Sequence, residues 1–183
     1  MKNASALDLM KIYQACCTPL YEVLENLPDK QFHWKPAPDA RSIAEIFRHL
    51  IRVDAMIFKE FGHSLPPDPG GEADAETLLA AFKTSNRQII SLLENLENDA
   101  DLAQPTTKII MEGHDNLGEW LVHLSQHYLY HFAQVAYLRR AQDRNWVSPN
   151  KRWEEATYVI SNNLQAMSPV LKIIAATANP PIQ

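Results

Sequence analysis

The 183-residue sequence contains only two cysteines, the adjacent pair Cys16 and Cys17. Neighbouring side chains on a helix point about 100° apart, so this pair predicts no ordinary structural disulfide. The absence of a Cys-x-x-Cys spacing also excludes a zinc ribbon. A nucleophilic or redox role stays open, but partly buried spectators are the simpler interpretation of both thiols.

Long apolar runs and basic clusters are also missing. No apolar stretch approaches the roughly 18 residues of a transmembrane span, and the N-terminal MKNASALDLMK lacks the apolar core of a signal peptide. We therefore expect a cytoplasmic protein without a membrane partner. The net charge is −5, and no Lys/Arg cluster exceeds the pair at residues 139–140, which argues against a nucleic-acid partner.

The composition is that of a globular protein. Apolar residues make up 46% and charged residues 21%, with only five glycines. We expect a single domain over residues 1–183, with a core bundle over about 5–142 and a helical extension over about 143–183.

Four segments carry apolar side chains at helical spacing, with links between them that contain proline or glycine. We expect helices near residues 6–27, 42–61, 74–97 and 116–141, with helical segments near 153–167 and 168–176 and a short β-prone run at 108–111. The resulting prediction is an all-α four-helix bundle. The 11-residue link 63–73 can span about 35 Å when extended, so the helices beside it need not be antiparallel.

Two helix starts have local signals. Ser42 and Glu45 form a capping box, and Asn116 with Glu119 forms a similar start. Pro19 falls inside the first predicted helix and predicts a kink there.

The last of the four helices has an unusual apolar stripe. Three consecutive positions on it are polar: His127, His131 and Gln134. Burying such groups without partners costs about 1–3 kcal/mol each, and a metal ion would satisfy the imidazoles. The stripe, at alternating steps of three and four, consists of Leu117, Trp120, Leu124, His127, His131, Gln134 and Leu138.

His127 and His131 are spaced to share one cation, because Cα atoms four residues apart on a helix are about 6 Å apart along its axis. His123 lies about 12 Å from His131 along that axis, too far for both to reach one ion. His49 sits on the apolar face of the second helix and supplies a third nitrogen. Neutral histidines hydrogen-bonded in the core remain the alternative.

Nothing in the sequence identifies a general base. Asp54 follows His49 by five residues and can face elsewhere, while His123, Tyr130 and Gln134 are candidates for groups that surround the ligands. The zincin motif His-Glu-x-x-His is absent, and the one Glu-x-x-His, at residues 60–63, straddles a helix end.

The order WKPAPDARSIAEIFRHLIRVD, a third helix, then LVHLSQHYLYHFAQVAYLRR resembles the DinB-like (DinB/YfiT) superfamily of metal-dependent enzymes. The resemblance covers about residues 5–142. It implies an up-down-down-up bundle, and His49, His127 and His131 as ligands of a divalent ion. The family often has Arg-Gly-Gln after the last histidine, whereas residues 132–134 here are Phe-Ala-Gln.

Three neutral histidines leave an open coordination position, which is typical of a catalytic site. The resemblance implies a thiol-dependent transferase or isomerase that uses a low-molecular-weight thiol. Metal-assisted hydrolysis and a non-catalytic helical interaction module are the alternatives. Imidazole ligands suit several metals. We expect zinc or nickel, with iron or manganese as alternatives.

The residues beyond the core bundle are rich in large apolar side chains, which need cover from the bundle or from a second subunit. We therefore expect a homodimer. These side chains are Trp146, Trp153, Tyr158 and Val159.

Overall fold

The computed structural model describes residues 4–96, 99–107, 114–160 and 162. Within these ranges every regular element is helical, and the only β-type pairing is an isolated bridge between Pro105 and Asn116. The predicted all-α class is therefore confirmed. The elements are α1 (Ala4–Glu22), α2 (Asp29–Phe32), α3 (Ile43–Glu60), α4 (Ala75–Glu94), η1 (Asp99–Ala103) and α5 (Leu117–Gln142), and residues 150–160 are also helical.

The starts of α3 and α5 follow their local sequences. The Ser42 hydroxyl accepts from the Glu45 amide at 3.2 Å, and the Glu45 carboxylate accepts from the Ser42 amide at 2.8 Å. This is the predicted capping box. At α5 the Asn116 side chain accepts from the Glu119 amide at 3.0 Å, while the Glu119 carboxylate accepts instead from the Asp115 amide at 2.7 Å.

The first helix is shorter than the sequence predicts, because α1 ends at Glu22 and not near residue 27. The chain then tightens into turns, and Asn26 adopts a positive φ of 54°. The Arg139 guanidinium of α5 donates to the carbonyl oxygens of Val23 at 2.7 Å and Glu25 at 3.0 Å. A distant side chain thus satisfies carbonyls that a longer helix would have used internally.

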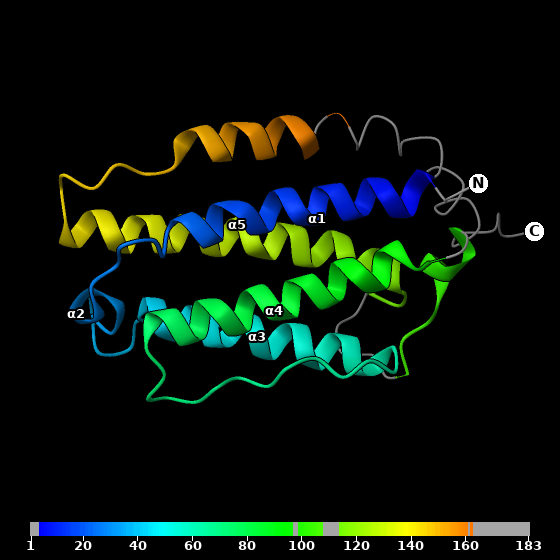
Figure 1. The fold of residues 1–183 in the computed structure, drawn as a ribbon, viewed down its shortest axis with the longest axis horizontal. Helices are drawn as coiled ribbons and strands as arrows, with labels where there is room; N and C mark the ends of the chain where they lie inside the picture. The colour runs from blue at the N-terminus through cyan, green and yellow to red at the C-terminus, as the bar shows by residue number, and fades with distance from the viewer. Residues whose placement is uncertain (1–3, 97–98, 108–113, 161, 163–183) are drawn as a thin grey trace, which may run out of the picture.

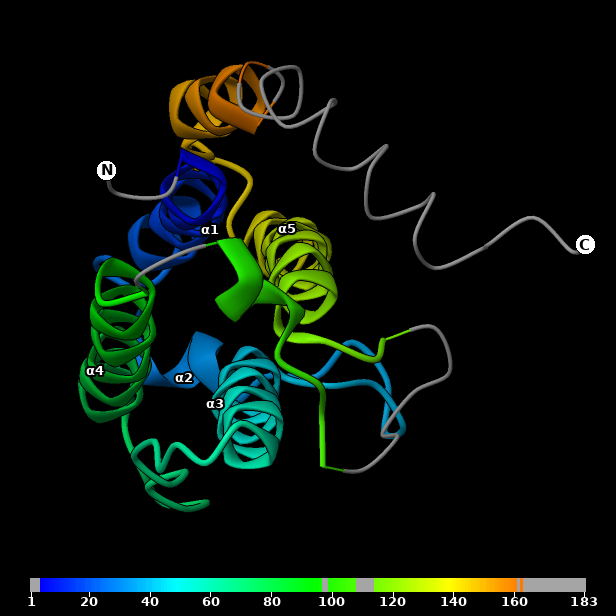
Figure 2. The same ribbon diagram turned by 90° about the vertical axis from the view of Figure 1, so that its right-hand side faces the viewer.

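The long helices lie side by side, and each contacts two others. α1 packs on α4 and α5, and α3 packs on the same two helices, so an end-on view shows the four around a common centre (Figure 2). α1 and α5 run in one direction, while α3 and α4 run in the other (Figure 1). The link between α3 and α4 returns along the length of the molecule, which lets these two neighbours run parallel.

A buried polar network occupies the centre of the four helices. The hydroxyls of Tyr13 and Tyr128 lie 2.8 Å apart, and the Asn86 amide donates to both, at 2.8 and 3.1 Å. Tyr21 donates to the Asn86 oxygen at 2.8 Å, and Tyr128 donates to the Asp54 carboxylate at 2.6 Å. The network therefore ties α1, α3, α4 and α5 together.

Both cysteines are buried, free thiols on α1. Burial raises the pKa of Cys16 to about 12 and raises the pKa of Cys17 as well. Both thiols are therefore neutral at physiological pH, as expected of spectators.

The helical segment 150–160 contacts α1 and α5. Arg152 pairs with Glu22 of α1 at 2.5 Å, and Trp153 stacks on Phe132 of α5 with 6.0 Å between ring centroids. The Arg139 guanidinium lies 4.6 Å from the centre of the Trp146 ring. The β-prone run at 108–111 and the segment at 168–176, both predicted above, lie outside the described residues, as does the end of the segment predicted at 153–167.

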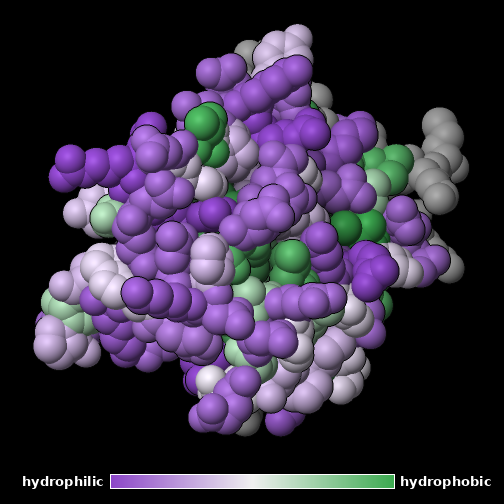
Figure 3. Space-filling model, turned by 60° about the vertical axis from the view of Figure 1, so that its left-hand side comes forward, coloured by the Kyte–Doolittle hydropathy of each residue, from purple (hydrophilic) through white to green (hydrophobic). Residues whose placement is uncertain are grey.

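The surface seen from the α2 end is mainly hydrophilic, and hydrophobic groups form only small patches on it (Figure 3). No helix in the described part of the chain is both long and apolar enough to span a membrane.

Candidate metal centre

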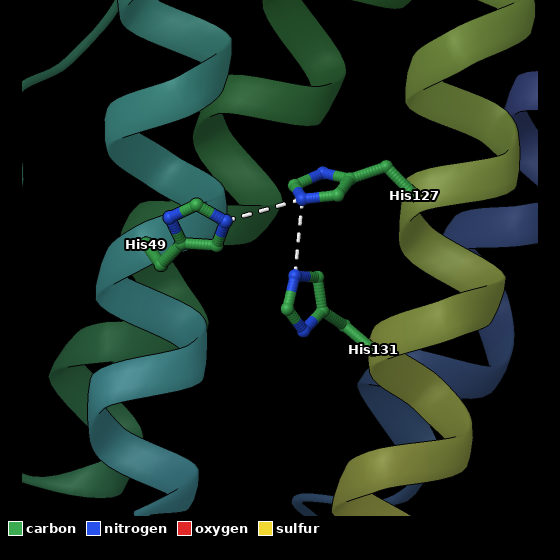
Figure 4. Close-up of side chains that lie close together, drawn as sticks. All are labelled: His49, His127 and His131. Carbon is green, nitrogen blue, oxygen red and sulfur yellow. Dashed lines mark hydrogen bonds between the residues drawn. The ribbon is translucent and has the colours of Figure 1, made fainter. Parts of the chain in front are cut away.

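Three histidines from two helices point toward one another between α3 and α5 (Figure 4). His49 lies on α3, and His127 and His131 lie one turn apart on α5. The Nε2 atom of His127 is 3.1 Å from Nε2 of His49 and 3.0 Å from Nε2 of His131. One ligand atom from each residue lies within 4.8 Å of the other two. The three residues singled out in the sequence are therefore brought together.

The protons available to these rings cannot satisfy both short contacts. The Nδ1 atom of His131 lies 2.7 Å from the Gln134 side-chain oxygen, which only accepts, so Nδ1 carries the proton. The Nε2 atom of neutral His131 then carries a lone pair and can only accept a hydrogen bond. A neutral His127 Nε2 that donates to it has no lone pair left for His49.

A divalent cation fits this arrangement. Zinc binds imidazole nitrogen at about 2.0–2.1 Å, which places tetrahedral ligand nitrogens about 3.3 Å apart. The Nε2 atom of His127 lies 3.1 Å from that of His49 and 3.0 Å from that of His131, close to that value. The cluster could therefore hold a metal ion with little movement of its side chains.

The electrostatic environment keeps the three imidazoles neutral. Burial, together with the charges of Arg41 and neighbouring histidines, lowers the pKa of His49 to about 4 and that of His127 to about 3. Burial also lowers the pKa of His131. Neutral imidazole is the form that binds a metal, so the site is prepared for ligation at neutral pH.

His127 lies at the margin of the core face of α5, whereas His131 is buried. His127 and Gln134 are only half-buried, whereas Tyr128 is fully buried. The sequence pattern predicted both histidines in the middle of the core stripe, and this prediction was wrong for His127, which is half-buried. The stripe is broad, and the bulky Tyr128 takes its centre because its hydroxyl joins the buried network.

The residues expected around the candidate ligands lie close to them. Gln134 fixes His131 through its Nδ1 atom, and the His123 ring stacks on His127 with centroids 5.8 Å apart. The Tyr130 ring lies 5.0 Å from that of His131 and is 61% exposed. The His127 Nδ1 atom is buried and lacks a hydrogen-bond partner in the described part of the chain.

Two other polar candidates lie away from the cluster. Asp54 faces the interior and bonds to Tyr128, so it is not placed to act as a general base at the histidines. His114 packs against Trp120 and His123, with centroid distances of 4.8 and 4.7 Å. It extends the row of rings beyond the cluster.

Comparison with known families identifies the one to which the sequence corresponds. The sequence model of the DinB superfamily matches residues 15–135, which include all three histidines. The chain belongs to the DinB superfamily. No curated protein and no solved structure matches it.

Phe132 stands where other members of the DinB superfamily often carry arginine. Its side chain is 6% exposed and stacks on Trp153 of the helical segment 150–160. Position 132 therefore packs against the extension and does not contribute a charge to the site.

Sequence reasoning missed Arg41, which lies in the loop before α3. It lines the cavity that also reaches His131, and its charge lowers the pKa of all three histidines. Nothing in the sequence around Arg41 indicates that it lies near the histidines. Only the packing of its loop against α5 brings Arg41 and His131 to the same cavity.

Proposed function

We propose that this protein is a divalent-metal-dependent enzyme with His49, His127 and His131 as its metal ligands. The observation that carries the proposal is the convergence of three neutral imidazoles. The Nε2 atom of His127 lies 3.1 Å from that of His49 and 3.0 Å from that of His131. The hydrogen bonds of the histidines themselves leave one contact unsatisfied, so a cation explains the geometry better than a hydrogen-bonded core.

Three protein ligands leave at least one coordination position open, which favours a catalytic over a structural role. A metal bound there would lower the pKa of a coordinated water or thiol. The Gln134 oxygen holds the proton of His131 on Nδ1 and directs the Nε2 lone pair toward the site. The imidazole of His123 covers one face of His127.

The reaction that we favour depends on a low-molecular-weight thiol. It is either the transfer of a group to that thiol or an isomerisation that the thiol assists. Membership of the DinB superfamily supports this choice, as does a cavity of about 480 Å³ beside His131. Metal-assisted hydrolysis uses the same open position and is the first alternative. A helical interaction module without catalysis is the second.

For the metal we favour zinc or nickel over iron or manganese. A ligand set made only of imidazole nitrogens supports this order, because manganese prefers carboxylate and water oxygens. Zinc is also common in sites with three histidines and one open position.

At the level of the whole chain, we propose the up-down-down-up four-helix bundle of the superfamily, within a single domain over residues 1–183. The directions of the four long helices in Figure 1 support the bundle. The contacts of residues 150–160 with α1 and α5 support one domain. The free thiols of Cys16 and Cys17 support a cytoplasmic location.

Metal analysis of untagged protein tests the proposal. Purified full-length chain should bind one divalent ion, and His49→Ala, His127→Ala and His131→Ala should each abolish tight binding. His33→Ala is the matched control, because His33 is exposed in a loop away from the cluster. If the wild-type chain binds no divalent ion at micromolar concentration, the enzyme proposal loses its support and the interaction module replaces it.

A further inference from the structure

A cavity of about 480 Å³ lies where the loop before α3 meets the second half of α5, and His131 forms part of its wall. Cavities of roughly 300–1,000 Å³ are typical of small-molecule sites. The cavity is therefore of a size to hold a small organic molecule with one end against the candidate metal centre.

The polar groups that line this cavity are mainly hydrogen-bond donors. The lining residues include Arg41, which carries a guanidinium, and Tyr130 and Tyr137, which carry hydroxyls. The Gln134 oxygen is engaged by His131, which leaves its amide N–H groups for a ligand. Among the described residues that line the cavity, none carries a carboxylate. A ligand with a negative charge would meet donors and no like charge.

Among the described residues, Arg41 also differs from its neighbours in having no carboxylate paired with it. Arg48 and Arg52 share the Asp68 carboxylate, at 3.0 and 3.5 Å. The Arg41 guanidinium has neither an ion pair nor a hydrogen bond with any residue that the structure describes.

We propose that this cavity binds the carboxylate of a small organic acid, with Arg41 as its ion-pair partner and the remainder of the molecule extending toward His131. A single guanidinium forms the two-pronged pair that a carboxylate accepts. Ile46, Leu138 and the Tyr137 ring supply apolar walls for the carbon skeleton. This inference rests on the proposed function, because it names the substrate class of the same site.

Binding of benzoate and of the neutral, isosteric benzamide tests the proposal. Both are titrated into full-length protein at pH 7 by calorimetry, with zinc added and without it. The zinc-free titration removes direct coordination of the carboxylate to metal. The wild-type chain should bind benzoate at least tenfold more tightly than benzamide, and Arg41→Gln should remove most of that preference. Arg41→Lys keeps the charge but loses the forked guanidinium. Its preference for benzoate should therefore lie between those of the wild type and Arg41→Gln.

Arg52→Gln is the matched control. It removes the same charge from the same region, but Arg52 does not line the cavity, so the preference for benzoate should change less than twofold. Equal affinity for the acid and the amide, no binding of either at millimolar concentration, or an unchanged preference in Arg41→Gln would each overturn the proposal.

The two proposals fail in different ways. If zinc binds and benzoate shows no dependence on Arg41, the carboxylate site is wrong and the metal centre stands. If no divalent ion binds but the Arg41-dependent preference for benzoate persists without zinc, the metal function is wrong and the carboxylate site stands.

Discussion

At the scale of single residues, the site depends on which imidazoles share one ion. The Nε2 atoms of His127 and His131 are 3.0 Å apart, whereas His123 contacts His127 only through stacked rings. His131→Ala should therefore abolish tight zinc binding, while His123→Ala should weaken it less. Zinc competition with a chromophoric chelator measures both. If His123→Ala removes the metal and His131→Ala retains it, the pair has been chosen wrongly.

Gln134 offers a second test at this scale, because it contacts the ring of His131 on the side away from the proposed ion. Gln134→Leu removes the acceptor 2.7 Å from Nδ1 and should weaken zinc binding by about 10–100-fold. The protein should still fold, since Gln134 is only half-buried. Gln126→Leu, at an exposed position of the same helix, is the control. Equal zinc affinity of the two variants would contradict a positioning role for Gln134.

At the scale of helices, the ends of the elements depend on both local and distant residues. The starts of α3 and α5 were predictable because their caps lie within three residues of the first turn. The end of α1 was not, because Arg139 contacts it from α5, more than a hundred residues away in sequence. The three candidate ligands could be singled out from spacing and family resemblance. The place of Arg41 was not, because it depends on how a loop packs against α5.

The contact between Arg139 and the end of α1 should be worth a measurable part of the stability. Arg139 is 4% exposed and donates to two backbone carbonyls. Arg139→Leu should lower the free energy of unfolding by about 2–4 kcal/mol, because those carbonyls lose charged donors. Arg140→Leu, at the exposed neighbouring position, should change it by about 0.5 kcal/mol or less. Urea denaturation compares them, and losses of equal size would contradict the assigned role.

Asp54 of α3 is bonded to Tyr128 of α5. Because its pKa is raised, we expect the stability of the fold to depend on pH. Burial raises its pKa to about 8, although the Tyr128 hydrogen bond opposes that shift. The carboxyl is thus protonated in the folded chain and ionised in the unfolded chain between about pH 4 and pH 8. The groups facing it, Tyr13, Cys17 and Tyr128, are neutral because their own pKa values are raised.

The direction of this pH dependence follows from the number of protons that the folded and unfolded states bind. In that window the folded state holds one more proton, so the free energy of unfolding falls as pH rises, by about 1 kcal/mol per unit. Asp54→Asn should remove this fall between pH 6.5 and about pH 7.5, while Asp8→Asn, in a surface pair with Lys11, should retain it. Denaturant midpoints across this range measure the effect. An identical slope in wild type and Asp54→Asn would show that Asp54 is already ionised when folded.

At the scale of the whole molecule, the extension beyond α5 bears on the homodimer expected from the sequence. Tyr158 is 70% exposed on the helical segment 150–160, and Trp153 is 40% exposed. Light scattering should give about twice the chain mass of 20.8 kDa, and Tyr158→Glu should shift the equilibrium toward the monomer. A single mass near 20.8 kDa at high concentration would count against a dimer.

The molecule as a whole positions α3 against α5, and this packing brings together the three histidines of the candidate metal centre. X-ray absorption at the zinc edge of the zinc-loaded, untagged chain tests it most directly. We predict three imidazole nitrogens at about 2.0–2.1 Å and at least one further light atom in the open position. A spectrum with sulfur ligands, or with fewer than three imidazoles, would contradict the site formed by His49, His127 and His131.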